Sequence, residues 1–208
     1  MNGIYTPSEI RADALIHVVG VGAAMLGAAW LVQRLSAGPP ALTFALGFYA
    51  TGLVGMTVAS AAYNLTTGPA KEWLRRFDHA MIFVMIAATY APFVTLRLPP
   101  ETAIPLGVAV GGGCAGGVVM KAFFPRRFDR FSILLYLGMG WAVAWAMEPL
   151  KACIGPRTLD LLVLGGIFYT VGVAFCLMER VRFHNALWHA CVLGGAGTHF
   201  ATMVVEFT

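Results

Sequence analysis

A small set of histidine, carboxylate, hydroxyl and amide side chains lies inside or at the edges of long apolar runs of this sequence. An ionisable group is costly in such a run if the run crosses a membrane, so each one is a candidate for function. Imidazoles with a carboxylate and a hydroxyl are the groups that bind a zinc ion and activate its water. The candidates are His17; Ser60, Tyr63 and Asn64; Asp78 and His79; and His184, Asn185, His189 and His199.

The spacing of these residues indicates which of them share a helix face. Ser60 and Asn64 are four residues apart, about 40° around a helix, and Asn185 and His189 repeat that spacing. His184 and His189 are five apart, so their side chains point about 140° away from each other. We therefore do not expect His184 and His189 to bind one ion together.

Each polar group also has a structural interpretation. His17 and His184 lie near the ends of their runs, where they can sit among lipid headgroups or form hydrogen bonds between helices. Asp78 follows Arg75 and another arginine, so a salt bridge at the membrane surface is an alternative to a catalytic role. His199 lies about 15 Å further along its helix than His189, and we expect it to make a packing hydrogen bond.

The elements that must position these side chains are membrane helices. The chain has 208 residues, of which 59% are hydrophobic and 12% are charged, whereas soluble domains carry about a quarter charged residues. A helix needs about 20 apolar residues to cross a bilayer. Seven runs meet this need, at 14–32, 41–65, 80–96, 103–120, 131–147, 159–178 and 186–205. The sequence predicts an all-α bundle of seven transmembrane helices in a single domain, 1–208.

The basic residues predict the orientation of the bundle, since those near helix ends tend to stay in the cytoplasm. With the N-terminus inside, ten basic residues fall on cytoplasmic segments and four on outside loops. We expect a cytoplasmic N-terminus, an outside C-terminus and a multi-pass protein of the bacterial inner-membrane type. Apart from His199, the polar residues of the first, second, third and seventh helices then share one depth near the cytoplasm. The net charge of +4 follows from topology and indicates no nucleic-acid partner; the expected partners are membrane lipids.

Other features of the sequence point to helix packing. Glu9 and Asp13 precede the first apolar run and no small-residue cleavage site follows it, so we expect no cleavable signal peptide. Pro92 is expected to kink the third helix. Four cysteines show no CxxC spacing and are interpreted as packing residues. Two interleaved GxxxG pairs at 112–117 favour bundle packing, with a dimerisation face as the alternative.

Five short motifs carry a resemblance to a known family. They are Tyr5-Thr-Pro-Ser-Glu9 followed by His17; Ser60-Ala-Ala-Tyr-Asn64-Leu; Arg76-Phe-Asp78-His79-Ala; Ala88-Thr-Tyr90-Ala-Pro92-Phe; and His184-Asn185-Ala-Leu-Trp188-His189 with His199. With these motifs in this order, the sequence resembles the hemolysin III branch of the progestin and adipoQ receptor family over nearly the whole chain. The family comprises seven-helix proteins related to alkaline ceramidases.

The resemblance implies a zinc site near the cytoplasmic face, with one histidine on helix two, two histidines on helix seven, and a serine and an aspartate close by. Carried over position by position, the serine is Ser60 and the aspartate is Asp78. The histidine of helix two falls on Asn64, and the first histidine of helix seven falls on Asn185. Only His189 keeps an imidazole at a ligand position.

Three states of this site stay open at the level of sequence. An amide oxygen is a weak ligand for zinc, so zinc would need His189, Asp78 and an unexpected histidine such as His184 or His17. The alternatives are a metal-free hydrogen-bonded cluster and a site for another ion.

Three functions follow from these states. The first is a lipid amide hydrolase in which Asp78 is the general base, Ser60 donates to the oxyanion or the water, and His189 binds the metal. The second is a non-catalytic lipid-sensing or membrane-homeostasis protein whose polar cluster only joins helices. The third is the cytolytic, pore-forming activity that gave the family branch its name. No span carries a ring of charge, so the sequence does not support this activity.

Overall fold

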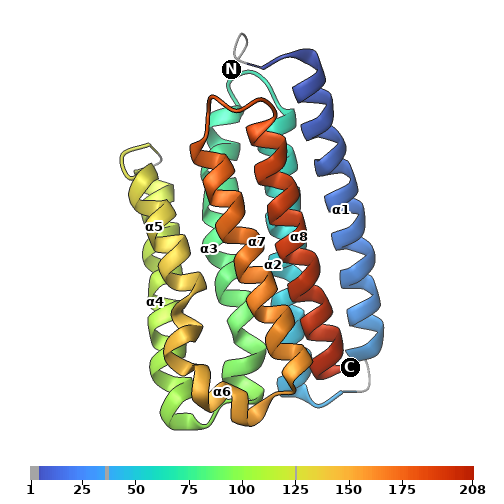
Figure 1. Ribbon diagram of the computed structural model, residues 1–208, viewed down its shortest axis with the longest axis vertical. Helices are drawn as coiled ribbons and strands as arrows, with labels where there is room; N and C mark the ends of the chain where they lie inside the picture. Colours follow the sequence, from blue (N-terminus) through green and yellow to red (C-terminus); the bar gives the residue numbers. More distant parts are fainter. Residues whose placement is uncertain (1–4, 36–37, 125) are drawn as a thin grey trace.

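The computed structural model describes residues 5–35, 38–124 and 126–208, which form a bundle of long helices (Figure 1). Within these ranges, seven segments are long and apolar enough to cross a membrane. The predicted all-α fold with seven long apolar helices is confirmed. The elements are α1 (Pro7–Leu35), α2 (Pro40–Leu65), α3 (Lys71–Leu96), α4 (Pro100–Phe123), α5 (Asp129–Gly140), the 3₁₀ helix η1 (Ala142–Ala146), α6 (Met147–Cys153), α7 (Pro156–Leu177) and α8 (His184–Phe207).

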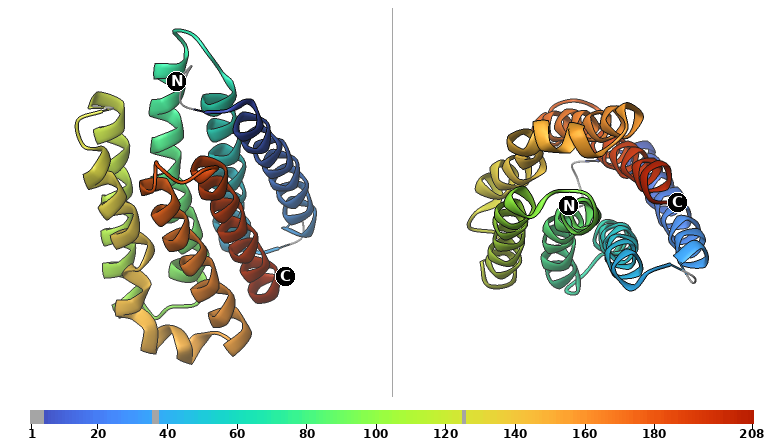
Figure 2. Two further views of the ribbon diagram at one scale, coloured as in Figure 1. Left: turned by 45° about the horizontal axis from the view of Figure 1, so that its top comes forward. Right: turned by 90° about the horizontal axis from the view of Figure 1, so that it is seen from below.

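The long helices are arranged in a ring. Seen along the bundle, the order around the ring is α1, α2, α3, α4, α5, α7 and α8, with α8 returning to α1 (Figure 2). Helices that follow each other in the chain pack side by side because the loops between them are short. Several helices begin with proline, as α2, α4 and α7 do, because proline fixes a helical φ where the missing N–H is not needed.

Glycines let some of the helices approach closely. A Cβ atom at Gly117 would overlap the ring of Phe83 on α3, and one at Gly113 would overlap Met139 on α5. The other GxxxG pair, Gly112 and Gly116, has nothing within 4 Å. One of the two predicted pairs therefore packs α4 against its neighbours, and the other faces away from the bundle.

The fifth span is interrupted, which the sequence did not predict. The run expected as one helix at 131–147 consists of α5, η1 and the start of α6. The hydroxyl of Tyr90 on α3 donates to the carbonyls of Met139 and Gly140, each at 2.9 Å. The same hydroxyl accepts a hydrogen bond from the N–H of Val143 at 2.9 Å. Tyr90 thus satisfies the backbone groups that the break releases, as an apolar solvent requires. By contrast, α3 continues as one helix through Pro92.

At the end of the bundle that carries the C-terminus, the Glu206 side chain joins three helices through hydrogen bonds. The Glu206 carboxylate accepts hydrogen bonds from Arg97 Nε at 2.6 Å and from Thr158 Oγ1 at 2.7 Å. Arg97 also donates to the Glu206 carbonyl at 2.8 Å. These contacts join the end of α3 and the start of α7 to the last turn of α8.

We expect Glu206→Ala to lower the free energy of unfolding by about 1–3 kcal/mol, because it leaves donors of Arg97 and Thr158 without their acceptor. Thermal unfolding of detergent-purified protein would measure the loss. Glu148→Ala is the matched control: the Glu148 side chain is 83% exposed and pairs only with Lys151 one turn away, whereas Glu206 is 10% exposed. Equal melting temperatures for the two variants would contradict the role of Glu206.

Candidate functional site

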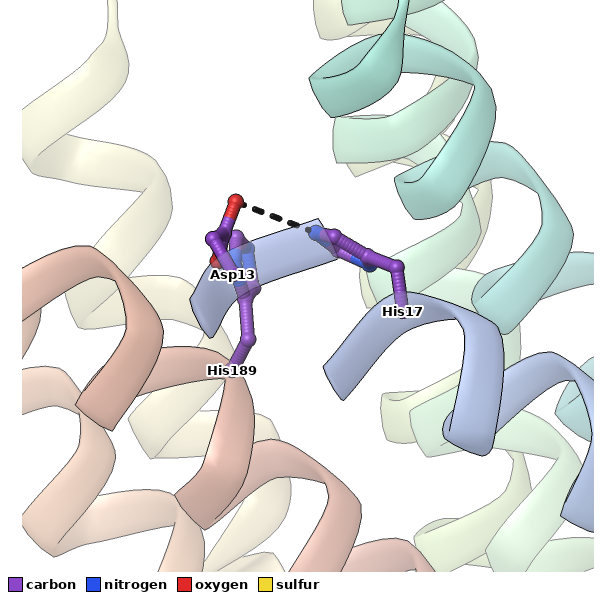
Figure 3. A group of neighbouring side chains, drawn as sticks. All are labelled: Asp13, His17 and His189. Carbon is purple, nitrogen blue, oxygen red and sulfur yellow. Dashed lines mark hydrogen bonds and ion pairs between the residues drawn. The ribbon is translucent and has the colours of Figure 1, made fainter. Parts of the chain in front are cut away.

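Asp13, His17 and His189 form a compact group at the end of the bundle that carries the N-terminus (Figure 3). Asp13 and His17 lie one turn apart on α1, and His189 reaches them from α8. Asp13 Oδ1 lies 2.6 Å from His189 Nδ1, and Asp13 Oδ2 lies 3.5 Å from His17 Nε2. One ligand atom from each residue lies within 4.8 Å of the others. We call these three residues the Asp13 group.

Contacts at the start of α1 and α8 hold the group together. One oxygen of Glu9 accepts the N–H of Phe183 at 2.9 Å, and the other accepts the N–H of Thr6 at 2.8 Å. Phe183 precedes α8 and has a left-handed φ of 63°, a conformation that costs roughly 1–2 kcal/mol for a residue with a Cβ. Glu9 therefore fixes the point where α8 begins, so that the next turns of α1 face His189.

Tyr5 adds a second link between the two helices. Its hydroxyl forms a hydrogen bond with His184 Nε2 at 3.3 Å. Burial, and after it the negative charge of Asp13, raises the pKa of the Tyr5 phenol. The phenol therefore keeps its proton at neutral pH, so the Tyr5 side chain is uncharged in its contact with His184.

A cavity of about 270 Å³ lies beside the Asp13 group, and the predicted catalytic residues line it. His17 and His189 line it together with Ser60 and Asp78. Asp78 is buried, and the Ser60 hydroxyl lies next to its carboxyl group. The rest of the wall is largely apolar, with Ile16, Ile82, Ile133, Val173, Val192 and Leu193. The polar site thus lies at the edge of a space suited to an acyl chain.

The arginines that precede Asp78 have other partners. Arg75 Nη2 donates to the Asp129 carboxylate at 2.6 Å, and Arg76 Nη1 donates to the Ala122 carbonyl at 3.1 Å. Asp78 points into the cavity wall beside Ser60. Through these contacts, Arg75 and Arg76 join α3 to α5 and α4.

Three residues predicted as metal ligands lie outside the cavity wall, among the residues that the structure describes. Asn64 Nδ2 donates to the Ser60 carbonyl of its own helix at 3.0 Å. His184 faces Tyr5, and Asn185 is half-buried. His199 makes the expected packing hydrogen bond, since its Nε2 donates to the Leu162 carbonyl at 3.2 Å. The structure brings together Ser60, Asp78 and His189, with His17 as the additional imidazole.

Asp13 was not among the residues predicted for the site. In the sequence, Asp13 is recognisable only as a charge that precedes the first apolar run. The available signal was the spacing Glu9, Asp13, His17, which places three polar groups on one face of α1 at intervals of four residues. That this face of α1 lies against His189 of α8 depends on the tertiary contact between Glu9 and Phe183, which the spacing does not show.

The Asp13 group fits a divalent metal such as zinc. Two imidazoles and one carboxylate leave a fourth position open, the pattern of catalytic zinc sites. His17 Nε2 is buried, and its contact with Asp13 Oδ2, at 3.5 Å, is longer than a normal hydrogen bond. A metal ion bound by these residues would give this buried nitrogen a closer partner. The set replaces the imidazoles missing at Asn64 and Asn185 with His17 and a charged carboxylate.

Comparisons with known proteins confirm the resemblance to the hemolysin III branch. A family model described as "Haemolysin-III related" matches residues 9–200. The chain is 34% identical to the Hemolysin-3 homolog of Bacillus subtilis (strain 168), over 95% of this chain and 93% of the relative. It is 33% identical to Hemolysin-3 of Bacillus cereus, over 92% and 89%. It is 27% identical to the human Monocyte to macrophage differentiation factor, over 96% and 85%.

Proposed function

Because the chain belongs to the haemolysin-III related family, we propose that it is a membrane-embedded metalloenzyme that hydrolyses a lipid amide. One observation carries the proposal: the two imidazoles of the Asp13 group, the Asp78 carboxylate and the Ser60 hydroxyl all line one largely apolar cavity. Hydrolysis of a lipid amide needs a metal-activated water, a base and a space for the acyl chain, and this cavity offers all three.

When bound at the Asp13 group, zinc would supply a polarised water of lowered pKa. Asp78 accepts a proton from the water that attacks the amide carbonyl, and returns it to the amine nitrogen as the C–N bond breaks. The products are a carboxylic acid and an amine. Ser60 donates a hydrogen bond that orients Asp78 or stabilises the oxyanion. The apolar wall holds the acyl chain and keeps bulk water out.

A non-catalytic lipid-sensing role is the second candidate, and one contact favours it. Asp13 already makes a hydrogen bond of 2.6 Å to His189, so the Asp13 group can join α1 to α8 without any metal. The asparagines at positions 64 and 185 also suit a site that has lost its original ligands. Metal content separates the two candidates.

Orientation in the membrane is part of the proposal. The end of the bundle that carries the Asp13 group also carries ten of the basic residues, so we place it at the cytoplasmic face. In a cysteine-free background and intact cells, a membrane-impermeant thiol reagent should label Gly155→Cys. Arg127→Cys, at the other end, should react only after lysis. The reverse pattern would place the site outside.

Elemental analysis of purified, chelator-washed protein tests the metal. We expect about one zinc per chain, because two imidazoles and a carboxylate are a complete set of protein ligands for an open zinc site. His17→Ala and His189→Ala should each lose the zinc. His184→Ala is the matched control and should retain it, since His184 faces Tyr5 instead. Wild-type protein without zinc would contradict the enzyme and leave the lipid-sensing role.

Turnover tests the base. Asp78→Asn should lower kcat for a long-chain N-acyl lipid by about 10²–10⁴-fold, the range for loss of a general base, while its zinc content stays unchanged. Release of fatty acid from a panel of such lipids in detergent micelles is the measurement. Asp160→Asn, an exposed carboxylate at the opposite end of the bundle, is the control. If zinc-loaded wild-type protein hydrolyses none of the panel, the proposed activity is wrong.

A further inference from the structure

Two cationic side chains line the same cavity as the Asp13 group. They are Arg75 on α3 and Lys121 on the last turn of α4. Both pair with one carboxylate, Asp129 at the start of α5: Lys121 Nζ donates to Oδ1 at 2.8 Å, and Arg75 Nη2 donates to Oδ2 at 2.6 Å. The cavity therefore has a second polar end, across from the metal-binding chemistry and on different helices.

Lys121 is buried although it could reach the surface. A lysine near the end of a membrane helix normally extends its amine toward the interface. Arg126, which follows on the next loop, behaves in this way: its side chain is 71% exposed and pairs with Glu72. The Lys121 side chain is only 1% exposed. Turning this amine inward costs desolvation free energy, so interactions of the amine inside the cavity must offset that cost.

The partners of Lys121 leave donor capacity in the cavity. An ammonium group has three N–H donors, and within the described ranges Nζ donates only to Asp129. The Asp129 side chain is 42% exposed, so water stabilises this carboxylate and it can be displaced toward solvent. An anion entering the cavity could then take its place between Lys121 and Arg75.

The remaining space of the cavity fits an acyl chain. Its wall is mainly apolar, and it adjoins a further cavity of about 90 Å³ that shares Met56, Tyr169 and Trp188 with it. The second cavity extends the apolar space toward His199, deeper in the bundle. A single long chain can follow this path, with its head beside Lys121 and Arg75.

We propose that Lys121 and Arg75 form a phosphate subsite, so that the ligand of this cavity is a single-chain lipid whose head carries a phosphate group. A phosphate bears a charge of about −1.5 to −2 and accepts several hydrogen bonds, which matches an ammonium and a guanidinium together. The inference rests on the proposed function in placing a lipid in the cavity. Binding is measured without turnover, so either proposal can fail alone.

The test compares three probes that differ in one part each: 1-oleoyl-glycerol 3-phosphate, 1-oleoyl-glycerol and inorganic phosphate. Native mass spectrometry of the chelator-washed full chain gives their dissociation constants. We expect the phosphorylated lipid to bind wild-type protein at least tenfold more tightly than 1-oleoyl-glycerol, and inorganic phosphate to bind far more weakly than the phosphorylated lipid. Equal binding of the two lipids, or equal binding of inorganic phosphate and the phosphorylated lipid, would overturn the inference.

Variants separate a subsite from a structural ion pair. Lys121→Met should bring the ratio of the two lipid dissociation constants close to one, and Lys121→Arg should retain most of the preference. Asp129→Asn removes the competing carboxylate and should maintain or increase the preference. Lys151→Met, which removes an exposed lysine at the other end, should leave it unchanged. If Lys121→Met does not fold, the sign of the Asp129→Asn effect decides. A fall in the preference there would overturn the inference, as would an unchanged ratio in folded Lys121→Met.

Discussion

Polar groups inside the spans of this protein must find partners within the bundle, because the hydrocarbon core of a bilayer offers none. The contacts that define the fold follow from this constraint. Tyr90 satisfies the backbone at the break between α5 and η1, and Glu206 joins three helices at one end. At the other end, Asp13 holds two imidazoles from different helices. The candidate site is thus one of several places where helices meet through polar groups, and it differs in placing two imidazoles on the same cavity wall as Asp78 and Ser60.

The composition of the site differs from the one that the resemblance implies. Amides stand at positions 64 and 185, where imidazoles were expected, and Asn64 turns back to its own helix. His17 and Asp13, both on α1, stand beside His189 instead. A carboxylate in place of an imidazole adds a negative charge next to the metal position, which strengthens attraction for a divalent cation. The candidate ligands therefore lie on α1 and α8, with none on α2, while Ser60 and Asp78 lie on the cavity wall.

Much of the fold could be predicted from the sequence, because hydropathy alone marks seven spans and short loops make successive helices neighbours. Ser60, Asp78 and His189 could be placed at one depth for the same reason. The break in the fifth span could not be predicted, since it depends on Tyr90, which lies about fifty residues earlier in the chain. Asp13 was missed because a carboxylate before an apolar run is an ordinary flanking charge. That this carboxylate faces inward is evident only from the packing of α1 against α8, which brings Asp13 to His189.

The contact between Glu9 and Phe183 also matters for how the protein is prepared in the laboratory. Tyr5 and Glu9, near the N-terminus, touch the beginning of α8, which carries His189. The C-terminus lies at the opposite end of the bundle (Figure 1). An affinity tag or fluorescent fusion placed directly before Tyr5 would lie next to these contacts and disturb the start of α8. A fusion at the C-terminus is remote from the site and is the better choice for purification.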